Sequence, residues 1–303
     1  MQLMNKVWAF TFALPLAIAS ATALAQQDFS KIEFKQVPVS DGLIMLQGAG
    51  GNIAALPGPD GLLIIDDDYT EMQDKLMAAL EAIEVNGPRF VLNTHWHFDH
   101  AGGNQKVGRS GATIVAHENV RSRLSSGGTI KAFGVDVSPA DRSALPAITY
   151  SDAMTMHWND FKLELSYAEP AHTDGDTVVY LSRGDALVAV HMGDLFFNGF
   201  YPFIDASSGG SALGVVAGVE AVLDNIDDDT VVIPGHGPLA TKADLKNYHA
   251  FLKSAVSRIA ALKSSGKSVD QIVAAKPLKD FEAEWGDGFL KTDVWISIIF
   301  AAI

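Results

Sequence analysis

The feature that most constrains this chain is a group of four metal-binding side chains within six residues. His95, His97, Asp99 and His100 follow an apolar segment, Phe90–Leu92, that is typical of a buried β-strand. Imidazole and carboxylate groups are preferred ligands of zinc. Residues i and i+2 at the end of a strand share a face, so His95 and His97 are expected to converge on one metal ion. Asp99 and His100, in the loop that follows, are expected to face a second.

The first 25 residues have the pattern of a secretory signal peptide. Lys6 supplies a positive charge, Val7–Ile18 forms an apolar stretch, and Ala23–Ala25 is a small-residue cleavage site. The apolar stretch is shorter than the ~20 residues that span a bilayer, so a membrane anchor is the less favoured alternative. We therefore expect a single catalytic domain at 26–303 with a helical C-terminal segment, periplasmic or secreted and free of the membrane after cleavage.

The net charge and the lack of cysteine exclude some classes of partner and some kinds of chemistry. The chain carries a formal net charge of −14 and contains no cysteine. Such acidity argues against nucleic acid and anionic membranes as partners. Without cysteine there is no disulfide, no thiolate ligand and no thiolate nucleophile. A small-molecule substrate is the expected partner, and the sequence predicts no particular oligomeric state.

Apolar periodicity predicts two β-rich halves, each followed by helices. Expected strands cover residues 43–47, 53–56, 62–65, 90–92, 112–116, 153–157, 161–168, 177–181, 186–190 and 230–233. Expected helices cover residues 71–85, 103–109, 118–124, 212–223 and 242–263. The least patterned part, 125–150, is expected to be a loop that joins the halves and borders the substrate cleft. Two such halves predict an α+β fold with two sheets packed face to face and helices outside.

An acidic triplet, Asp66–Asp68, precedes the first expected helix. Acidic residues in this position commonly cap a helix and face solvent, and we interpret the triplet in that way. A ligand role for one of the three aspartates is the less favoured alternative.

Three further ligand-type residues stand at separate strand-to-loop junctions: His172, Asp194 and His236. Loops at one end of a sandwich can bring distant parts of a chain together, so all three are candidates for the same cluster. His191 lies three residues before Asp194 and could compete with it as a ligand. We interpret His191 instead as a residue that supports the site or packs in the core.

The run His95-x-His97-x-Asp99-His100 resembles the H-x-H-x-D-H motif of the metallo-β-lactamase superfamily. The resemblance extends from about Val37 to about Leu252. It implies an αβ/βα sandwich of two mixed β-sheets flanked by helices, with two zinc ions (Zn2+) at one edge between the sheets. The implied ligands are His95, His97 and His172 for the first ion, and Asp99, His100 and His236 for the second, with Asp194 bridging or at the second ion.

Seven nitrogen and oxygen ligands can hold two zinc ions and leave a position on each for water. Water shared by two zinc ions has its pKa lowered from ~15.7 toward ~7, which makes hydroxide available at neutral pH. Hydrolysis is therefore the expected reaction, with a metal-bridging hydroxide as the nucleophile. Asp99 is expected to orient that nucleophile as well as to bind metal.

The resemblance leaves more than one function open. Segment Ala171–Leu181 resembles the corresponding run of true metallo-β-lactamases and export agrees with it, so opening of the β-lactam amide, an antibiotic-resistance activity, is the favoured expectation. Asp194 stands where one β-lactamase subclass has cysteine, and Phe197 where it has a lysine that meets the substrate carboxylate. Aspartate there is typical of members that cleave thioesters, lactones or phosphodiesters, so a dizinc hydrolase of esters, lactones or thioesters is the first alternative. A di-iron redox protein or a non-catalytic metal-binding protein is the second.

The aromatic segment Phe196–Phe203 suggests a cleft wall for an apolar or ring-bearing substrate, or else a hydrophobic cluster under a loop. Within it, Asn198 and Tyr201 are candidate catalytic donors to a developing oxyanion. Near the end of the chain, Trp285 and Trp295 predict that the segment after residue 264 packs on the body of the protein.

Overall fold

The computed structural model describes residues 28–303, so the predicted signal peptide at 1–25 lies outside the described residues. The first half of the chain forms a mixed sheet. Its seven strands are, in spatial order, β1 (Lys35–Ser40), β2 (Leu43–Gln47), β3 (Ile53–Leu56), β4 (Leu62–Ile65), β5 (Pro88–Leu92), β6 (Thr113–His117) and β9 (Ile148–Tyr150). Strands β1 to β4 pair antiparallel, whereas β4, β5, β6 and β9 pair parallel. The carboxyl ends of the parallel strands therefore meet at one edge, where ligands commonly bind.

The second half forms a second mixed sheet. Its five strands are, in spatial order, β10 (Ala153–Trp158), β11 (Phe161–Tyr167), β12 (Thr177–Arg183), β13 (Ala186–His191) and β14 (Val231–Ile233). All neighbours are antiparallel except β13 and β14, which pair parallel. A separate hairpin is formed by β7 (Gly128–Ile130) and β8 (Val135–Val137).

Helices flank both sheets. The α-helices are α2 (Gln73–Glu81), α3 (Phe98–Ala101), α4 (Asn104–Arg109), α5 (Glu118–Ser126), α6 (Ala212–Asn225), α7 (Lys242–Ser264), α8 (Val269–Ala275), α9 (Glu282–Trp285) and α10 (Thr292–Ala302). Short 3-10 helices are η1 (Phe29–Lys31), η2 (Thr70–Met72), η3 (Arg142–Ala144), η4 (Gly193–Leu195) and η5 (Ala206–Ser208). Within residues 28–303, no helix has both the length and the apolar character needed to cross a membrane.

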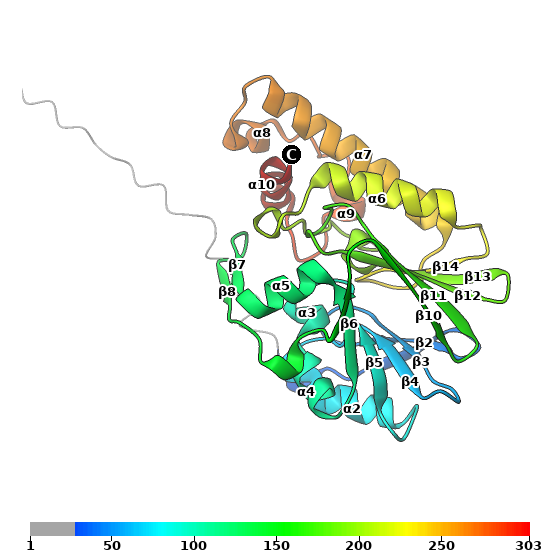
Figure 1. Cartoon of the computed structure of the whole chain (residues 1–303). Helices are drawn as coiled ribbons and strands as arrows, with labels where there is room; N and C mark the ends of the chain where they lie inside the picture. Colours follow the sequence, from blue (N-terminus) through cyan, green and yellow to red (C-terminus); the bar gives the residue numbers. More distant parts are fainter. Residues whose placement is uncertain (1–27) are drawn as a thin grey trace, which may run out of the picture.

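The two sheets pack face to face, with α2 and α4 outside the first and α6, α7 and α10 outside the second (Figure 1). Strand β4 shows why the sequence folds in this way. Leu63 and Ile65 point into the core between the sheets, while Leu62 and Ile64 point into the core under the outer helices. A strand covered on both faces needs an unbroken apolar run. The structure confirms the predicted αβ/βα sandwich.

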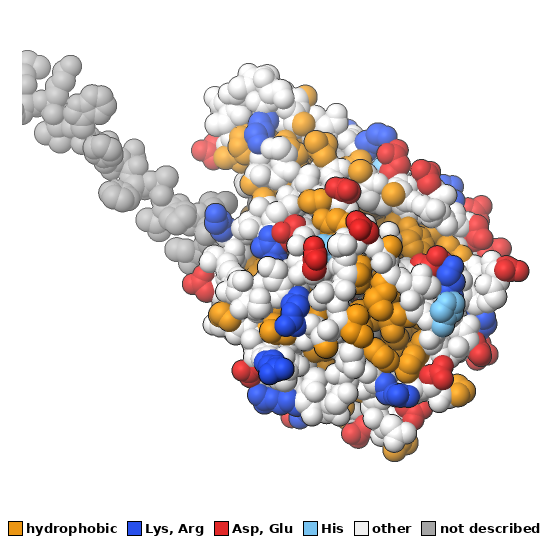
Figure 2. Space-filling model, in the orientation of Figure 1, with side chains coloured by type: hydrophobic (Ala, Val, Ile, Leu, Met, Phe, Trp, Pro, Cys, Tyr) orange, Lys and Arg blue, Asp and Glu red, His pale blue; other side chains and the backbone are white. Residues whose placement is uncertain are grey.

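The core between the sheets reaches the surface along one open side of the sandwich. Met154, Met156 and Trp158 on the edge strand β10 are half-buried and pack against this core. Figure 2 shows hydrophobic side chains gathered on that face between the two sheets. The alternate residues of this edge strand, Ala153, Thr155 and His157, are exposed on its other face.

Two expected elements differ from the structure. The helix expected over 71–85 is shorter, because η2 precedes α2 and the α-helix itself ends at Glu81. The expected loop over 125–150 instead contains the β7–β8 hairpin, η3 and β9, which pairs parallel with β6. Three-residue strands are too short to show alternation in the sequence, so their pairing is set by neighbouring strands.

The C-terminal segment packs on the body, as its tryptophans predict. Trp285 and Trp295 are both buried. The Trp295 ring stacks on Tyr201 with centroids 4.5 Å apart, and its indole Nε1 donates to the Pro202 carbonyl at 2.7 Å. Helix α10 is thereby tied to the aromatic segment that follows η4.

Candidate metal centre

Four segments bring all seven predicted ligands together at one edge of the sandwich. Asp99 and His100 lie on the short helix α3 rather than in a loop as expected, and Asp194 lies on η4. The ligand atoms of the seven residues form two groups, each with atoms within 4.8 Å of one another: His95, His97, His172 and Asp194 in the first, and Asp99, His100 and His236 in the second. The prediction that His95 and His97 converge holds, but the reason differs. Strand β5 ends at Leu92, so both histidines lie in the loop between β5 and α3 rather than on a strand.

The first group is fully buried. His172 Nε2 lies 2.9 Å from His97 Nδ1 and 3.3 Å from Asp194 Oδ2. His95 Nε2 lies 3.8 Å from the same Asp194 oxygen. His172 reaches this position from the loop between β11 and β12, which is joined to the β5 loop by a hydrogen bond from the Thr177 amide to the Thr94 carbonyl, 2.8 Å long. Loops from both sheets therefore build this group.

The second group is closer to solvent. His100 Nε2 lies 3.2 Å from His236 Nε2, and Asp99 Oδ2 lies 3.3 Å from His236 Nε2 and 3.8 Å from His100 Nε2. His100 is completely buried, whereas the side chains of Asp99 and His236 are 16% and 19% exposed. The second group therefore faces the side from which a substrate can enter.

Asp194 lies between the two groups and presents one oxygen to each. Its Oδ2 faces the first group, while its Oδ1 lies 3.0 Å from His100 Nε2 and 3.3 Å from His236 Nε2. A close approach of Gly235 holds this carboxylate in place, since a Cβ at that residue would lie 2.1 Å from Asp194 Oδ1. The geometry is that of a carboxylate shared by two cations.

For three of the histidines, hydrogen bonds on the outer side of the ring show which nitrogen faces the centre. His172 Nδ1 donates to the Phe203 carbonyl at 2.7 Å, and His97 Nε2 to the Asp205 carboxylate at 3.1 Å. His100 Nδ1 donates to Asp66 at 2.7 Å. In the neutral imidazole the other nitrogen then carries a lone pair. Such outer partners are a usual feature of metal-binding histidines, because they set the tautomer and orient the ring.

These tautomers fit a bound cation. His172 Nε2 and His97 Nδ1 face each other at 2.9 Å, and both carry lone pairs. His95 Nε2 is buried without any hydrogen-bond partner, and buried Asp194 Oδ1 has only the imidazole nitrogens of His100 and His236 beside it. Buried polar atoms rarely lack partners, and lone pairs that face one another repel unless a positive charge lies between them. Five imidazoles and two carboxylates without a thiolate form a donor set suited to zinc and also acceptable to iron.

Burial and mutual repulsion keep the His95 and His172 rings in the neutral form that can bind a metal. Burial, reinforced by nearby His100, lowers the pKa of His95 well below its usual value, and burial likewise lowers the pKa of His172 against the opposing charge of Asp194. In the second group burial also opposes protonation. There, however, the carboxylates of Asp194 and Asp99 outweigh it and raise the pKa of His100 well above its usual value and that of His236 to about 9. The carboxylates therefore create a negative potential at this end of the site, which stabilises a cation there.

The interpretation of Asp66–Asp68 as a solvated cap is wrong. All three aspartates are completely buried, and Asp66 accepts hydrogen bonds from the Thr94 amide at 2.7 Å, the Thr94 hydroxyl at 2.8 Å and His100 Nδ1 at 2.7 Å. The reason is topological. Strands β4 and β5 are parallel, so the residue after β4 lies beside the metal-binding loop after β5. Asp66 therefore orients a ligand and does not cap a helix.

Substitution of Asp66 by asparagine is expected to weaken metal binding about 10- to 100-fold, the usual cost of losing an outer hydrogen-bond partner. An amide presents N–H groups where the carboxylate accepts, so the His100 ring loses its fixed tautomer. Competition with a chromogenic chelator measures the affinity.

The neighbouring Asp67→Asn variant is a matched control. Burial raises the pKa of Asp67 well above its usual value, and one of its oxygens accepts from the Gly103 amide at 2.8 Å, a bond that asparagine keeps. Equal metal affinities for Asp66→Asn and Asp67→Asn would contradict the assigned role of Asp66.

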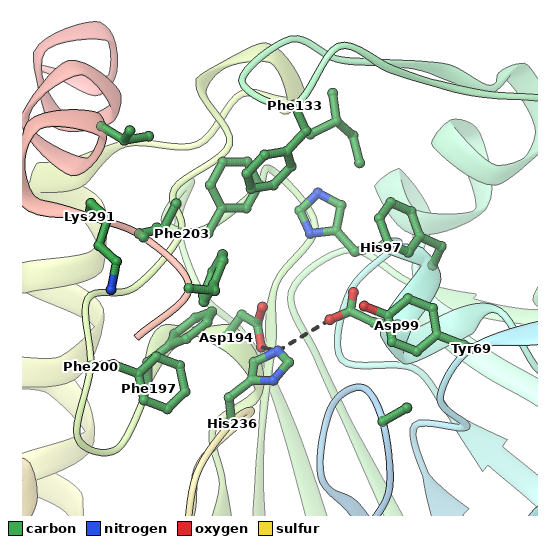
Figure 3. Close-up of a pocket in the computed structure, with 16 residues that line it drawn as sticks. Tyr69, His97, Asp99, Phe133, Asp194, Phe197, Phe200, Phe203, His236 and Lys291 are labelled. Atoms are coloured by element: carbon green, nitrogen blue, oxygen red, sulfur yellow. Dashed lines mark ion pairs between the residues drawn. The ribbon is translucent and has the colours of Figure 1, made fainter. Parts of the chain in front are cut away.

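A cavity of about 460 Å³ opens directly onto the metal centre (Figure 3). Asp99, Asp194 and His236 form its polar end, and most of the remaining wall is apolar. The apolar rings that line it are Phe98, Phe133, Phe197, Phe200, Phe203 and Phe289. The aromatic segment after η4 therefore supplies a cleft wall, as one of its two interpretations predicted, while its buried members Phe196 and Tyr201 pack in the core.

The structure does not bring Asn198 and Tyr201 into the site. The Tyr201 ring is buried against Trp295, and its hydroxyl lies 3.4 Å from Thr292 Oγ1. The Asn198 amide donates to the Pro238 carbonyl at 3.0 Å. Neither residue lines the cavity, because alternate residues of this segment point into the core or to the surface. Their expected role as oxyanion donors is therefore corrected.

Tyr201→Phe and Asn198→Ala are accordingly expected to change kcat by less than about twofold, since a catalytic donor must lie within hydrogen-bond reach of the reacting atoms. Steady-state kinetics of the two metal-loaded variants measures this. A loss of ten times or more in kcat with an unchanged melting temperature would restore the original expectation.

Sequence reasoning missed three residues that the structure places at the site. Asp66 and Asp205 hold ligand histidines from outside, and Tyr69 lines the cavity with its hydroxyl directed toward Asp99 (Figure 3). For Asp66 a signal existed in its position directly after a buried strand. His191 is buried, and its Nε2 lies 3.0 Å from the Asn52 carbonyl, so it supports the core as expected.

Fold and site together define a class of protein: an αβ/βα sandwich with two adjoining groups of histidine and aspartate side chains at one edge that could hold metal ions. The family model described as the metallo-beta-lactamase superfamily matches residues 55–236. The chain belongs to the metallo-β-lactamase superfamily and is a hydrolase of that superfamily.

Several individual proteins are similar to it. The probable metallo-hydrolase YqgX of Bacillus subtilis is 26% identical over 157 residues, which is 50% of this chain and 69% of the relative. The probable hydroxyacylglutathione hydrolase glo2 of Schizosaccharomyces pombe is 26% identical over 196 residues, 63% of this chain and 66% of the relative. Among solved structures, the subclass B3 metallo-β-lactamase BJP-1 of Bradyrhizobium japonicum superposes with a TM-score of 0.62 at 16% identity, covering 79% of this chain and 98% of that one. At this identity the structural likeness establishes the fold alone.

Proposed function

We propose that this protein is an exported dizinc hydrolase that cleaves an acyl bond of a small molecule, best an ester, thioester or lactone. The observation that carries the proposal is Asp194, which presents one oxygen to each ligand group at the polar end of the cavity. The predicted signal peptide supports export, and the curated relative named as a probable hydroxyacylglutathione hydrolase supports the type of bond.

The residues of the chain have separable tasks. Two zinc ions held there would activate water and polarise the scissile carbonyl. Although burial opposes ionisation, His100 and His236 hold the pKa of Asp99 at about 2, so its carboxylate accepts a hydrogen bond from the attacking water and orients it. The water oxygen forms the new bond to the carbonyl carbon, the bond to the leaving oxygen or sulfur breaks, and the leaving atom takes the proton that water loses. The aromatic walls exclude bulk water.

Shared use of Asp194 favours esters, thioesters and lactones over amides. A carboxylate between two cations reduces the positive charge available to the departing group. Burial opposes its ionisation, but the surrounding histidines hold the pKa of Asp194 well below its usual value, so it has no proton to give to a departing amine. Alkoxide and especially thiolate leaving groups need less protonation than an amine nitrogen does.

Opening of the β-lactam amide is the second candidate, and one observation favours it. Segment Ala171–Leu181, which resembles true metallo-β-lactamases, places His172 in the first ligand group and extends into β12 beside it. Ring strain in a β-lactam also lessens the need for leaving-group assistance. A strained amide is therefore compatible with the same site.

A substrate panel with metal analysis tests the proposal. Purified chain of residues 26–303 is assayed with an acyl thioester, a lactone, a nitrophenyl ester and nitrocefin, before and after chelation and zinc addition. We expect two zinc ions per chain, hydrolysis that chelation abolishes and zinc restores, and faster turnover of at least one of the first three than of nitrocefin.

The outcomes separate the alternatives. Fastest turnover of nitrocefin would support the β-lactamase candidate instead. Native iron with no hydrolysis of any substrate would favour the di-iron redox alternative, and full zinc occupancy without hydrolysis would favour a non-catalytic metal-binding protein.

A further inference from the structure

The wall of the cavity opposite Asp99 and Tyr69 carries a positive charge. Of the sixteen residues that line the cavity, Lys291 is the only lysine or arginine. Figure 3 shows its side chain on the far side of the cavity from Asp99, beside Phe200. The charge is separated from the carboxylates by apolar rings, so it belongs to a different part of the binding surface from the metal centre.

Within residues 28–303, the Lys291 ammonium has no carboxylate partner. Its Nζ lies 3.4 Å from the Gly288 carbonyl, and no ion pair is formed. Other lysines, such as Lys75, Lys106 and Lys253, each pair with a carboxylate. Lys291 is thus free to bind an anion without first breaking an ion pair.

The backbone that carries Lys291 is held in place. Gly288 lies against Phe200, where an added Cβ would fall 2.6 Å from the Phe200 Cβ. The Lys291 carbonyl accepts from the Trp295 amide at 2.9 Å at the start of α10, and Trp295 is itself anchored to the Pro202 carbonyl. A rigid backbone at Lys291 reduces the conformational entropy that is lost when this long side chain binds a ligand.

We propose that Lys291 binds an anionic group at the end of the substrate remote from the scissile bond. The inference rests on the proposed function and narrows it. The substrate class is an organic anion with an apolar or ring-bearing body, whose acyl bond lies at the metal centre while its carboxylate or sulfonate lies at Lys291. Asp99, Asp194 and His236 stand at the polar end of the cavity and Lys291 on the opposite wall, so a substrate that spans the cavity can place its acyl bond at one end and its anionic group at the other.

Two dyes with the same apolar body form the test. Anilinonaphthalene sulfonate carries an anionic group, and phenylnaphthylamine is the same ring system without it. Fluorescence titration of the zinc-loaded protein measures both dissociation constants in the wild type, Lys291→Met, Lys291→Arg and the control Lys253→Met, an exposed lysine on α7. We expect Lys291→Met to weaken the sulfonate roughly tenfold, the usual scale for a charged hydrogen bond, and to leave phenylnaphthylamine within about twofold. Lys291→Arg and Lys253→Met should bind both dyes like the wild type.

Equal effects of Lys291→Met on both dyes, or no effect on either, would overturn the inference. Because the titration needs no turnover, its result is independent of the substrate panel. If Lys291→Met selectively weakens binding of the sulfonate dye but the protein hydrolyses no substrate, the anion site stands and the hydrolase proposal is rejected. If the protein hydrolyses a substrate but Lys291→Met weakens neither dye selectively, the hydrolase proposal stands and the anion site is rejected.

Discussion

Replacement of Asp194 by asparagine is expected to lower turnover by roughly 10³-fold or more, the largest effect of any single change, because it removes stabilisation of several kcal/mol from both halves of the centre. Asp194 Oδ2 lies 3.3 Å from His172 Nε2, and Oδ1 lies 3.0 Å from His100 Nε2. Asparagine keeps the shape but loses the charge, and its NH2 group cannot accept or ligate. Metal content by mass spectrometry and kcat are measured on the same preparation.

A matched control removes the same charge elsewhere. Asp280 pairs with Arg258 at the surface of the C-terminal helices, so Asp280→Asn should retain metal and activity. Retention of two metal ions and of wild-type kcat in Asp194→Asn would refute the shared-carboxylate geometry.

The second large effect is expected at Asp99, where catalysis and metal binding should separate. Asp99→Asn is expected to reduce kcat by about 10²- to 10³-fold while reducing metal content much less. The His100 and His236 rings and Asp194 Oδ1 remain to hold the second ion, whereas no other carboxylate lining the cavity stands at Asp99's position. Parallel measurement of kcat, KM and metal stoichiometry distinguishes the two roles.

His236→Ala gives the comparison for Asp99→Asn, since it removes a ring that faces Asp99 at 3.3 Å and Asp194 at 3.3 Å. That variant should lose metal and activity together. If Asp99→Asn behaves in the same way and loses its metal in full, Asp99 serves only as a ligand and does not orient water.

Hydrogen bonds from outside the centre orient two of its histidines. His97 is held by Asp205, which precedes η5, and His100 by Asp66, which follows β4. Although burial opposes ionisation of Asp205, hydrogen bonds from His97, Ser207 and Ser208 hold its pKa below the usual range. Each ligand is thus oriented by a segment distant in sequence, which makes metal affinity sensitive to the packing of the whole sandwich.

Substrate selectivity depends on parts of the chain that carry no ligand. The β7–β8 hairpin contributes Ile130 and Phe133 to the cavity, and the segment before α10 contributes Phe289 and Lys291. Residues 125–150 were expected to border the cleft, and they do so as a hairpin rather than as a loop. The C-terminal tryptophans predicted packing, but gave no sign that the same segment forms a wall of the cavity.

The layered fold and the seven side chains that gather at the site could be predicted from the sequence, and with them the chemistry of the donor set. His95, His97, Asp99 and His100 are dense enough to be recognised alone, and His172, Asp194 and His236 stand where strands give way to loops. Such local signals survive in a sequence because spacing along the chain produces them.

The orientation of these residues, and the position of Asp194 between the two groups, could not be read from the sequence and became visible in the three-dimensional structure. The position of Asp194 between two groups and of Asp66 behind His100 depends on the parallel pairs β13–β14 and β4–β5, whose ends meet at one edge. The packing of the chain also places Tyr201 in the core and Lys291 on the cavity wall. Contacts between residues far apart in sequence follow from packing, and packing leaves no local pattern to read.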